Sequence, residues 1–86
     1  HMTKTITVRY FASIREAMGT GEETWATTAP TVAALRQELA GRSAQAALAL
    51  AEDQPVRLAL NQAMCPPDAP IAPGDEVAFF PPVTWG

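Results

Sequence analysis

Two segments, one near each end of the chain, predict strands, and in the first of them hydrophobic and polar residues alternate strictly. Over residues 5–11 every second side chain is apolar: Ile6, Val8 and Tyr10. The second segment covers residues 76–80 and ends in Phe79 and Phe80. Because successive side chains of a strand point to opposite faces, both segments predict strands with one buried face and one open face.

Helical spacing appears between these two strands. Thr31 is a good N-cap for the principal predicted helix, and Gly41 ends it. The apolar side chains on one side of this helix recur three or four residues apart: Val32, Leu35 and Leu39. Residues 12–18 are predicted to form a short helical turn, and the alanine-rich residues 44–50 a second short helix.

Weaker patterns complete the order of elements. Residues 23–27 predict a short strand, and the alternation over 56–60 predicts another with Val56, Leu58 and Leu60 inward. Asn61–Gln62 is a predicted turn before a short strand that runs through Met64. The expected order is strand, strand, helix, strand, short strand, strand.

This order predicts an α+β fold in which one principal helix packs on one face of a mixed sheet. It suits a β-grasp sheet whose first and last strands are adjacent and parallel. The main rival, a ferredoxin-like split βαβ fold, needs a second full-length helix, and residues 44–50 are too short for it. We expect a β-grasp domain over residues 3–80 and an extended, flexible C-terminal tail over residues 81–86.

Composition narrows the class of protein. The 86 residues are 48% hydrophobic and 17% charged, which indicates one globular domain. The six basic residues are scattered and the net charge is −3, so nucleic-acid binding is not expected. No signal peptide is visible and no apolar run approaches the ~20 residues of a membrane span. Cys65 is the single cysteine, and a cytoplasmic location is the simplest expectation.

The chain carries little catalytic chemistry of its own. It has no central histidine, no pairing of a nucleophile with a base, no glycine-rich phosphate loop and no Cys/His cluster for a metal. The acidic pairs Glu22–Glu23 and Glu52–Asp53 are interpreted as solvated turn residues. A non-catalytic protein is therefore expected.

The C-terminus is the most distinctive segment. Pro81 and Pro82 favour an extended conformation and donate no backbone hydrogen bonds, so the tail should leave the sheet. A terminal glycine, Gly86, leaves a slim carboxylate that another protein's active site could admit. The alternative is an ordinary frayed end.

The last strand also predicts an interaction surface. If Val77 and Phe79 face the core, Phe80 lies on the opposite face beside the departing tail. Met64 is a plausible companion there, and a methionine with an aromatic residue on an open sheet face is typical of a binding surface. The alternative is that residues 44–50 cover Phe80.

Five segments together resemble the small, sulfur-carrying subunits of molybdopterin synthase, a ubiquitin-related β-grasp family. The segments are Arg9–Ala12, Arg15–Glu16, Pro30–Arg36, Asn61–Gln62 and Gly74–Thr84. The resemblance spans nearly all of residues 5–86, and the Gly-Asp-Glu-Val-Ala-Phe-Phe-Pro-Pro-Val-Thr run is its most specific part.

The resemblance implies a sulfur carrier for molybdenum cofactor biosynthesis. An ATP-dependent activating enzyme would adenylate Gly86, and sulfur transfer would then give a C-terminal thiocarboxylate. The large synthase subunit would admit the tail, so that the sulfur reaches the pyranopterin precursor. No cofactor is expected to stay bound to the chain itself.

The resemblance also implies roles for individual residues. Phe80 and Met64 would make the hydrophobic contact with partners, and Arg15 would dock on the activating enzyme. The segment that threads into the partner would be made of four residues: Pro81, Pro82, Val83 and Thr84.

One residue departs from the family pattern, which ends in two glycines. Trp85 stands before Gly86, and a narrow tunnel for two glycines has no room for an indole. Two alternatives therefore stay open. In the first, the chain is a sulfur carrier for another acceptor, such as the thiamine thiazole pathway. In the second, it is a β-grasp interaction module without terminal chemistry.

Overall fold

The computed structural model describes residues 3–81 of the chain. Within them lie, in order, β1 (Lys4–Tyr10), α1 (Ala12–Met18), β2 (Glu22–Thr27), α2 (Val32–Ala40), α3 (Ala44–Leu50), β3 (Arg57–Leu60), β4 (Ala63–Met64) and β5 (Glu76–Phe80). The strands form one sheet in the order β2-β1-β5-β3-β4. β1 and β5 are parallel, and the other pairs are antiparallel. The predicted α+β class and β-grasp topology are confirmed.

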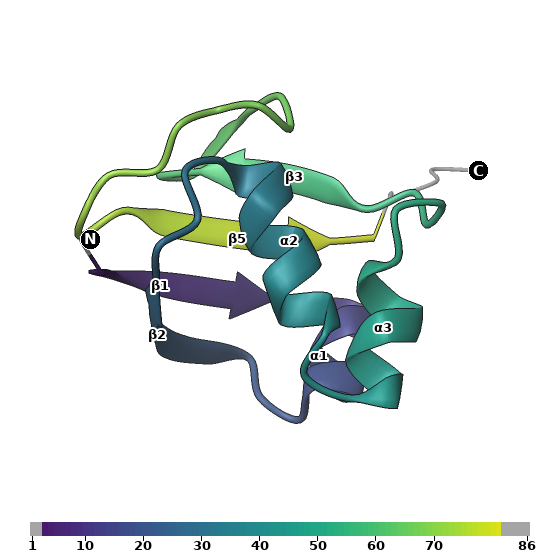
Figure 1. The fold of residues 1–86 in the computed structure, drawn as a ribbon. Helices are drawn as coiled ribbons and strands as arrows, with labels where there is room; N and C mark the ends of the chain where they lie inside the picture. The colour runs from purple at the N-terminus through teal and green to yellow at the C-terminus, as the bar shows by residue number, and fades with distance from the viewer. Residues whose placement is uncertain (1–2, 82–86) are drawn as a thin grey trace.

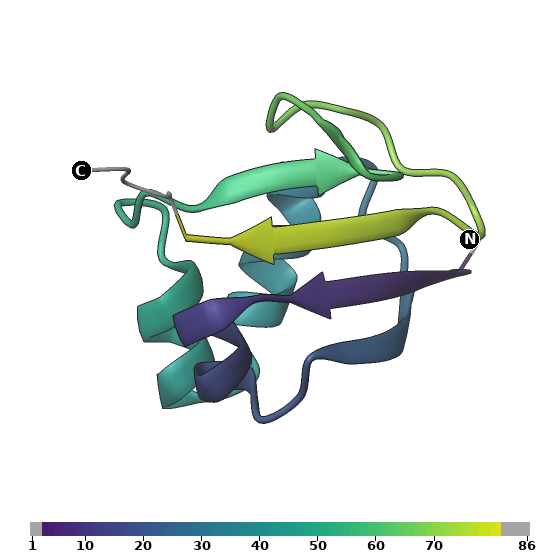
Figure 2. The ribbon, with the colours of Figure 1, turned by 180° about the vertical axis from the view of Figure 1, so that it is seen from behind.

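The helices occupy two places relative to the sheet. α2 lies across one face, whereas α1 and α3 lie at the end of the sheet where β1 and β5 finish (Figure 1). Seen from behind, the other face has no described helix across it (Figure 2). The short helices predicted at residues 12–18 and 44–50 are present as α1 and α3, with seven residues each beside the nine of the principal helix α2.

The core lies between the sheet and α2. Val77 and Phe79 of β5 are both completely buried, and the Phe79 ring stacks on Tyr10 with centroids 6.3 Å apart. Leu58 of β3 and Ile71 of the loop before β5 also belong to the core. The other large core side chains come from β1 and the helices: Ile6, Val8, Ile14, Val32, Leu35, Leu39 and Leu50. The inward faces predicted for the first strand and for the principal helix are thus confirmed.

The strand predicted over residues 56–60 needs a correction. β3 begins at Arg57, and of its predicted inward residues only Leu58 is buried. Val56, which precedes β3, and Leu60, its last residue, are only half-buried and pack against the core.

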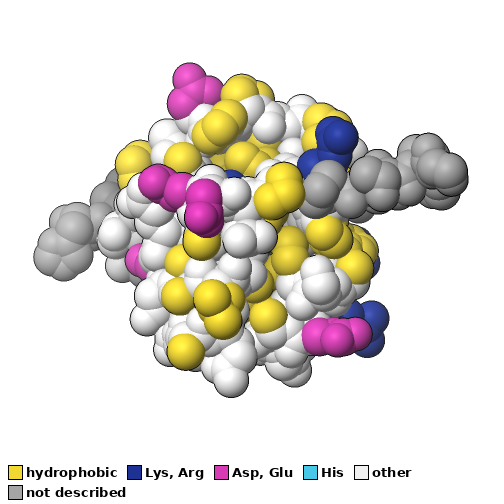
Figure 3. Space-filling view, turned by 90° about the vertical axis from the view of Figure 1, so that its right-hand side faces the viewer, with side chains coloured by type: hydrophobic (Ala, Val, Ile, Leu, Met, Phe, Trp, Pro, Cys, Tyr) yellow, Lys and Arg dark blue, Asp and Glu magenta, His cyan; other side chains and the backbone are white. Residues whose placement is uncertain are grey.

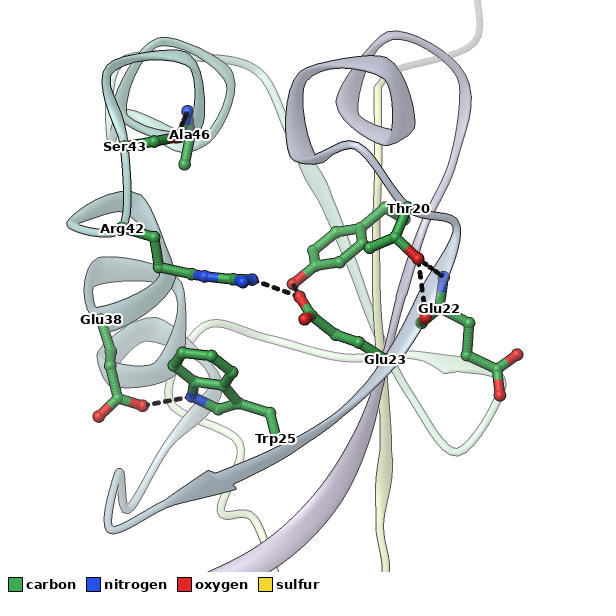
Figure 4. Close-up of polar contacts among 9 residues, drawn as sticks. Thr20, Glu22, Glu23, Trp25, Glu38, Arg42, Ser43 and Ala46 are labelled. Carbon is green, nitrogen blue, oxygen red and sulfur yellow. Dashed lines mark hydrogen bonds and ion pairs between the residues drawn. The ribbon is translucent and has the colours of Figure 1, made fainter.

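Side-chain caps mark the starts of α2 and α3, and a left-handed glycine ends α1. The Thr31 hydroxyl accepts a hydrogen bond of 3.2 Å from the backbone N–H of Ala34 at the start of α2. Ser43 caps α3 in the same way through the N–H of Ala46, at 3.0 Å (Figure 4). Gly19 ends α1 with φ of 80°, a left-handed conformation that glycine adopts without steric cost.

Asn61 joins the end of β3 to the start of β5. Its side-chain Oδ1 accepts from the backbone N–H of Glu76 at 3.0 Å, and its Nδ2 donates to Asp75 at 3.1 Å. Asn61 and Gln62 both have positive φ, 52° and 70°, as a tight hairpin turn between β3 and β4 requires. The predicted turn is confirmed, and it holds β5 in place at its N-terminal end.

A polar network ties β2 to the helix layer (Figure 4). Glu23 accepts a hydrogen bond of 2.6 Å from the Tyr10 hydroxyl and forms an ion pair with Arg42. The Arg42 guanidinium lies 4.6 Å from the centroid of the Trp25 ring, and the Trp25 indole donates to Glu38 at 2.9 Å. These contacts attach an edge strand to α2 and to the turn that follows it.

This network corrects one sequence interpretation. Glu22 and Glu23 belong to β2 rather than to a solvated turn, and Glu23 is half-buried on the helix side. Burial of the Tyr10 hydroxyl, and then its hydrogen bond to Glu23, raise the pKa of Tyr10 well above its ordinary value. Tyr10 therefore stays protonated throughout the neutral range.

Candidate functional site

The site is built at the end of the central strand, β5. β5 is hydrogen-bonded to β1 on one side and to β3 on the other, and buried Val77 and Phe79 hold it in the core. After Phe80 the backbone leaves the sheet at Pro81, which cannot donate a ladder hydrogen bond. The chain beyond Pro81 therefore follows directly from the central strand of the sheet.

Phe80 and Phe11 form an aromatic pair beside this exit. Their rings meet edge to face, with centroids 6.0 Å apart and an interplanar angle of 88°. Phe11 continues the β1–β5 ladder, since its N–H donates to the carbonyl of Phe79 at 3.2 Å. Together with Ala12 and Pro81 the two rings line a shallow apolar groove of about 350 Å³.

Met64 lies on the same face of the sheet as Phe80. The register places Met64 beside Ala59 and Ala59 beside Ala78, which is two residues before Phe80 on β5. Met64 is 59% exposed, whereas the two alanines are almost buried. The face therefore has an exposed methionine and an aromatic pair separated by a flat strip of small side chains.

Two arginines flank this apolar face. Arg9 is the register partner of Ala78, and Arg57 is the register partner of Phe80. The Arg9 guanidinium lies 5.3 Å from the centroid of the Phe11 ring, a cation–π distance. The predicted surface of Phe80 and Met64 is thus a larger one with a basic margin.

Arg15 lies on α1, at the same end of the molecule. Its side chain is exposed and runs across Gly21, where an added Cβ would lie 3.2 Å from the Arg15 Nε. α1 begins directly after Phe11, so Arg15 and the Phe11–Phe80 pair belong to one end of the fold. Figure 3 views this end and shows many hydrophobic side chains with only a few charged groups among them.

A second groove lies between α1 and α3. It has a volume of about 310 Å³, and its walls include Ile14, Leu48 and Pro55. Leu48 is 74% exposed, and Pro81 forms part of the rim. The base of the tail therefore lies between two apolar depressions, one on the sheet and one between the helices.

Phe11 is the residue of this site that sequence reasoning missed. The signal was present, because the two-residue period of the first strand places Phe11 on the same face as Thr7 and Arg9. The predicted residues Pro82, Val83, Thr84, Trp85 and Gly86 lie outside the described part of the chain.

The described residues can be compared with the requirements of a metal site, a reactive thiol and a membrane-spanning helix. Within residues 3–81 no three His, Cys, Asp or Glu side chains gather as a metal site would require. Burial raises the pKa of the Cys65 thiol, which lowers its thiolate fraction at neutral pH. Over the same residues, no helix has the length and apolar character that crossing a membrane requires.

Comparison with known proteins gives concordant results. The model of the ThiS family matches residues 8–86. The molybdopterin synthase sulfur carrier subunit of Escherichia coli (strain K12) is 51% identical over 81 residues, which cover 94% of this chain and 99% of that protein.

Two solved structures share the fold. The HVO 2177 protein of Haloferax volcanii superimposes with a TM-score of 0.82 at 28% identity, covering 98% of this chain and 88% of that one. The complex of subunits 1 and 2 of molybdopterin-converting factor from Helicobacter pylori 26695 contains a chain with a TM-score of 0.62 at 25% identity. That match covers 95% of this chain and 99% of the other.

Proposed function

This chain belongs to the ThiS family, and we propose that it is the sulfur carrier subunit of a molybdopterin synthase, acting in molybdenum cofactor biosynthesis. The observation that carries the proposal is the 51% identity to such a subunit over 94% of the chain. The chain is a carrier rather than a catalyst, because its chemistry resides in its own C-terminal carboxylate.

The proposed chemistry starts from the weakness of a carboxylate as an electrophile. Attack on a carboxylate must add a nucleophile to an anion, so a partner enzyme first converts Gly86 to an acyl-adenylate with ATP. A sulfur donor then displaces AMP, and the product is a terminal thiocarboxylate. Its sulfur attacks the pyranopterin precursor in the large subunit. Because the activation consumes ATP, the proposal includes a cytoplasmic location.

The face around Phe80 supports the docking part of the proposal. Phe80, Phe11 and Met64 present apolar side chains on a sheet face that no described helix crosses. The Helicobacter pylori structure is a complex of subunits 1 and 2 of molybdopterin-converting factor. By analogy, we assign the apolar face of this chain to contact with the large synthase subunit. Arg15, exposed on α1, is assigned to docking on the activating enzyme.

The tail carries the delivery step. Pro81, Pro82, Val83 and Thr84 form the segment that threads into the large subunit. Because proline restricts the backbone, a proline-containing segment loses less conformational entropy on insertion than a flexible one would. The central position of β5 supports this step, because a partner that binds the tail acts on a strand anchored on both sides.

The proposal is tested by intact mass spectrometry after incubation with ATP, activating enzyme and a sulfur donor. We expect the mass gain of replacing one oxygen by sulfur, and deletion of Gly86 should abolish it. A chain that stays as the carboxylate under conditions that convert the Escherichia coli relative would refute the carrier function.

Trp85 is the one observation that favours a second candidate function. An interaction module without terminal chemistry tolerates an indole beside Gly86. If the chain is a carrier, the Trp85→Gly variant should be adenylated faster than the unaltered chain. Equal adenylation rates for the two forms would show that Trp85 is compatible with sulfur-carrier function. If neither form is adenylated, the interaction module becomes the better assignment.

A further inference from the structure

Arg9 lies at the margin of the open apolar face, and its guanidinium makes no hydrogen bond within residues 3–81. Its guanidinium is 3.7 Å from Glu22 and 3.6 Å from Glu76, and both distances are longer than a hydrogen bond. The Arg9 Nε is buried and has no hydrogen-bond partner among the described residues. The two carboxylates balance its charge without satisfying its donors.

The surroundings of Arg9 hold the guanidinium against the apolar surface. It lies over the Phe11 ring, and its register partner on β5 is Ala78. The Arg9 side chain is 38% exposed, so its outer N–H groups still reach solvent. In the free chain water can complete their hydrogen bonds.

Any partner that covers Phe11 and Phe80 also removes this water. An apolar cover would leave charged donors buried and unpaired, which costs far more than an ordinary lost hydrogen bond. A carboxylate avoids the cost, because it accepts two parallel hydrogen bonds from a guanidinium.

We propose that Arg9 is the polar specificity anchor of the face formed by Phe11, Phe80 and Met64. The partner it fits is a protein surface with an apolar centre and an aspartate or glutamate that reaches the Arg9 guanidinium. The inference rests on the proposed function, since the partner is taken to be the large synthase subunit. It adds the chemistry by which that partner would be recognised.

Arg57 provides a matched control on the same face. It is the register partner of Phe80 and is exposed, and its side chain makes no ion pair or hydrogen bond within residues 3–81. Its charge is therefore free in solvent, whereas that of Arg9 lies against an aromatic ring. Removing either charge changes the net charge of the face equally, but only Arg9 has an orphaned buried donor.

The test measures the affinity of the large subunit for the full chain and its variants by calorimetry, at low and at high salt. Arg9→Gln should weaken binding by at least about 30-fold, and the loss should persist at high salt because the pair is desolvated. Arg57→Gln should weaken binding by less than about fivefold, and high salt should remove that loss. Arg9→Lys should recover only part of the affinity, because an ammonium lacks the planar fork.

Each other outcome overturns the inference in a distinct way. Equal losses of affinity for Arg9→Gln and Arg57→Gln, both removed by high salt, would mean that the two arginines act only through general electrostatic attraction. Wild-type affinity for Arg9→Gln would mean that Arg9 is not recognised, while the docking face itself would stand. Failure of the unaltered chain to bind would instead refute the proposed function.

Two further measurements control for a damaged fold and for self-association. Thermal unfolding of each variant identifies a loss of binding that comes from a damaged fold, since Arg9 lies within β1. Sedimentation of the chain alone tests whether the face binds a second copy. If the chain alone forms a dimer and Arg9→Gln dissociates it, the occupant of this face would be a second copy of the chain rather than a carboxylate-bearing partner.

Discussion

Phe79 and Phe80 are the same residue type, adjacent on one strand, and they lie in opposite environments. Phe79 is completely buried against Tyr10 beneath α2, whereas Phe80 is half-buried on the open face against Phe11. The helix-covered face is closed by large apolar side chains. The open face has aromatic rings, an exposed methionine and arginines.

The difference shows how a small domain separates stability from recognition. Apolar area already buried in the free chain stabilises the fold, while area still exposed remains available to a partner. A two-residue period lets one strand serve both purposes. The comparison between the two faces can be tested by changing one side at a time.

The largest effect is expected from Phe79→Ala. Removal of a fully buried aromatic side chain leaves a cavity and should lower the free energy of unfolding by about 3–5 kcal/mol. Phe80→Ala removes the same atoms from the open face and should cost about 1 kcal/mol, the range of an edge-to-face contact. Chemical denaturation measures both, and equal losses would show that the two faces do not differ.

The second effect concerns binding. Phe80→Ala and Phe11→Ala should each weaken association with the large subunit by about 2 kcal/mol or more, as truncation of an aromatic anchor does. Leu48→Ala is the control, because Leu48 is 74% exposed but lies on α3, away from the sheet face. A loss for Leu48→Ala as large as for Phe80→Ala would move the docking surface to the groove between α1 and α3.

The third effect concerns pH and the covered face. The raised pKa of Tyr10 means that the folded chain holds the phenolic proton more tightly than the unfolded chain does. Its stabilising contribution is complete below the ordinary pKa of 10.0 and is lost as pH rises above it. Unfolding free energy should then fall by up to about 1.4 kcal/mol per pH unit.

The chain contains one tyrosine, so tyrosinate absorbance reports this titration directly. In Tyr10→Phe the fall of stability above pH 10 should disappear, after an initial loss of about 1 kcal/mol for the hydrogen bond to Glu23. An unchanged pH profile in Tyr10→Phe would assign the alkaline transition to other groups.

The smallest effect should change stability without affecting either face. Gln62 has φ of 70°, and glycine adopts this conformation without the steric cost of a side chain. Gln62→Gly should therefore raise the free energy of unfolding by about 0.5–1 kcal/mol, with partner affinity unchanged. Gly74→Ala is the reverse control, because Gly74 has φ of 85° and a Cβ there is strained.

Much of this fold could be predicted because its signals are local. The strand predicted over residues 76–80 coincides with β5, and the alternating segment 5–11 differs from β1 by one residue at each end. The caps at Thr31 and Gly19 are equally local, since each acts on backbone groups within one helical turn. The β-grasp topology followed from the order of these elements.

The parts that could not be predicted depend on which strands are neighbours. Ala59 and Ala78 are almost buried on a face that no described helix crosses, because taller residues on adjacent strands surround them. Likewise, Phe11 meets Phe80 only because β1 and β5 pair in parallel. Glu23 was misread for the same reason, since its partner Arg42 comes from beyond α2.

The candidate site was predictable to the same extent. Phe80 was predicted from the alternation of side-chain direction and Met64 from its place near the end of a strand. The two residues do share a face, yet nothing local in the sequence shows that two alanines separate them. The orphaned Arg9 donor could not be foreseen, because it depends on distances to Glu22 and Glu76 on two different strands.

The parallel pairing of β1 with β5 has a mechanical consequence. The first strand and the last described strand lie side by side and run in the same direction, so tension applied to the two ends would slide one past the other. The ladder bonds from Thr7–Glu76 to Tyr10–Phe79 would then bear the load together rather than opening one at a time. A partner that binds the tail and pulls on it would therefore meet mechanical resistance from the whole β1–β5 pairing before either strand detaches.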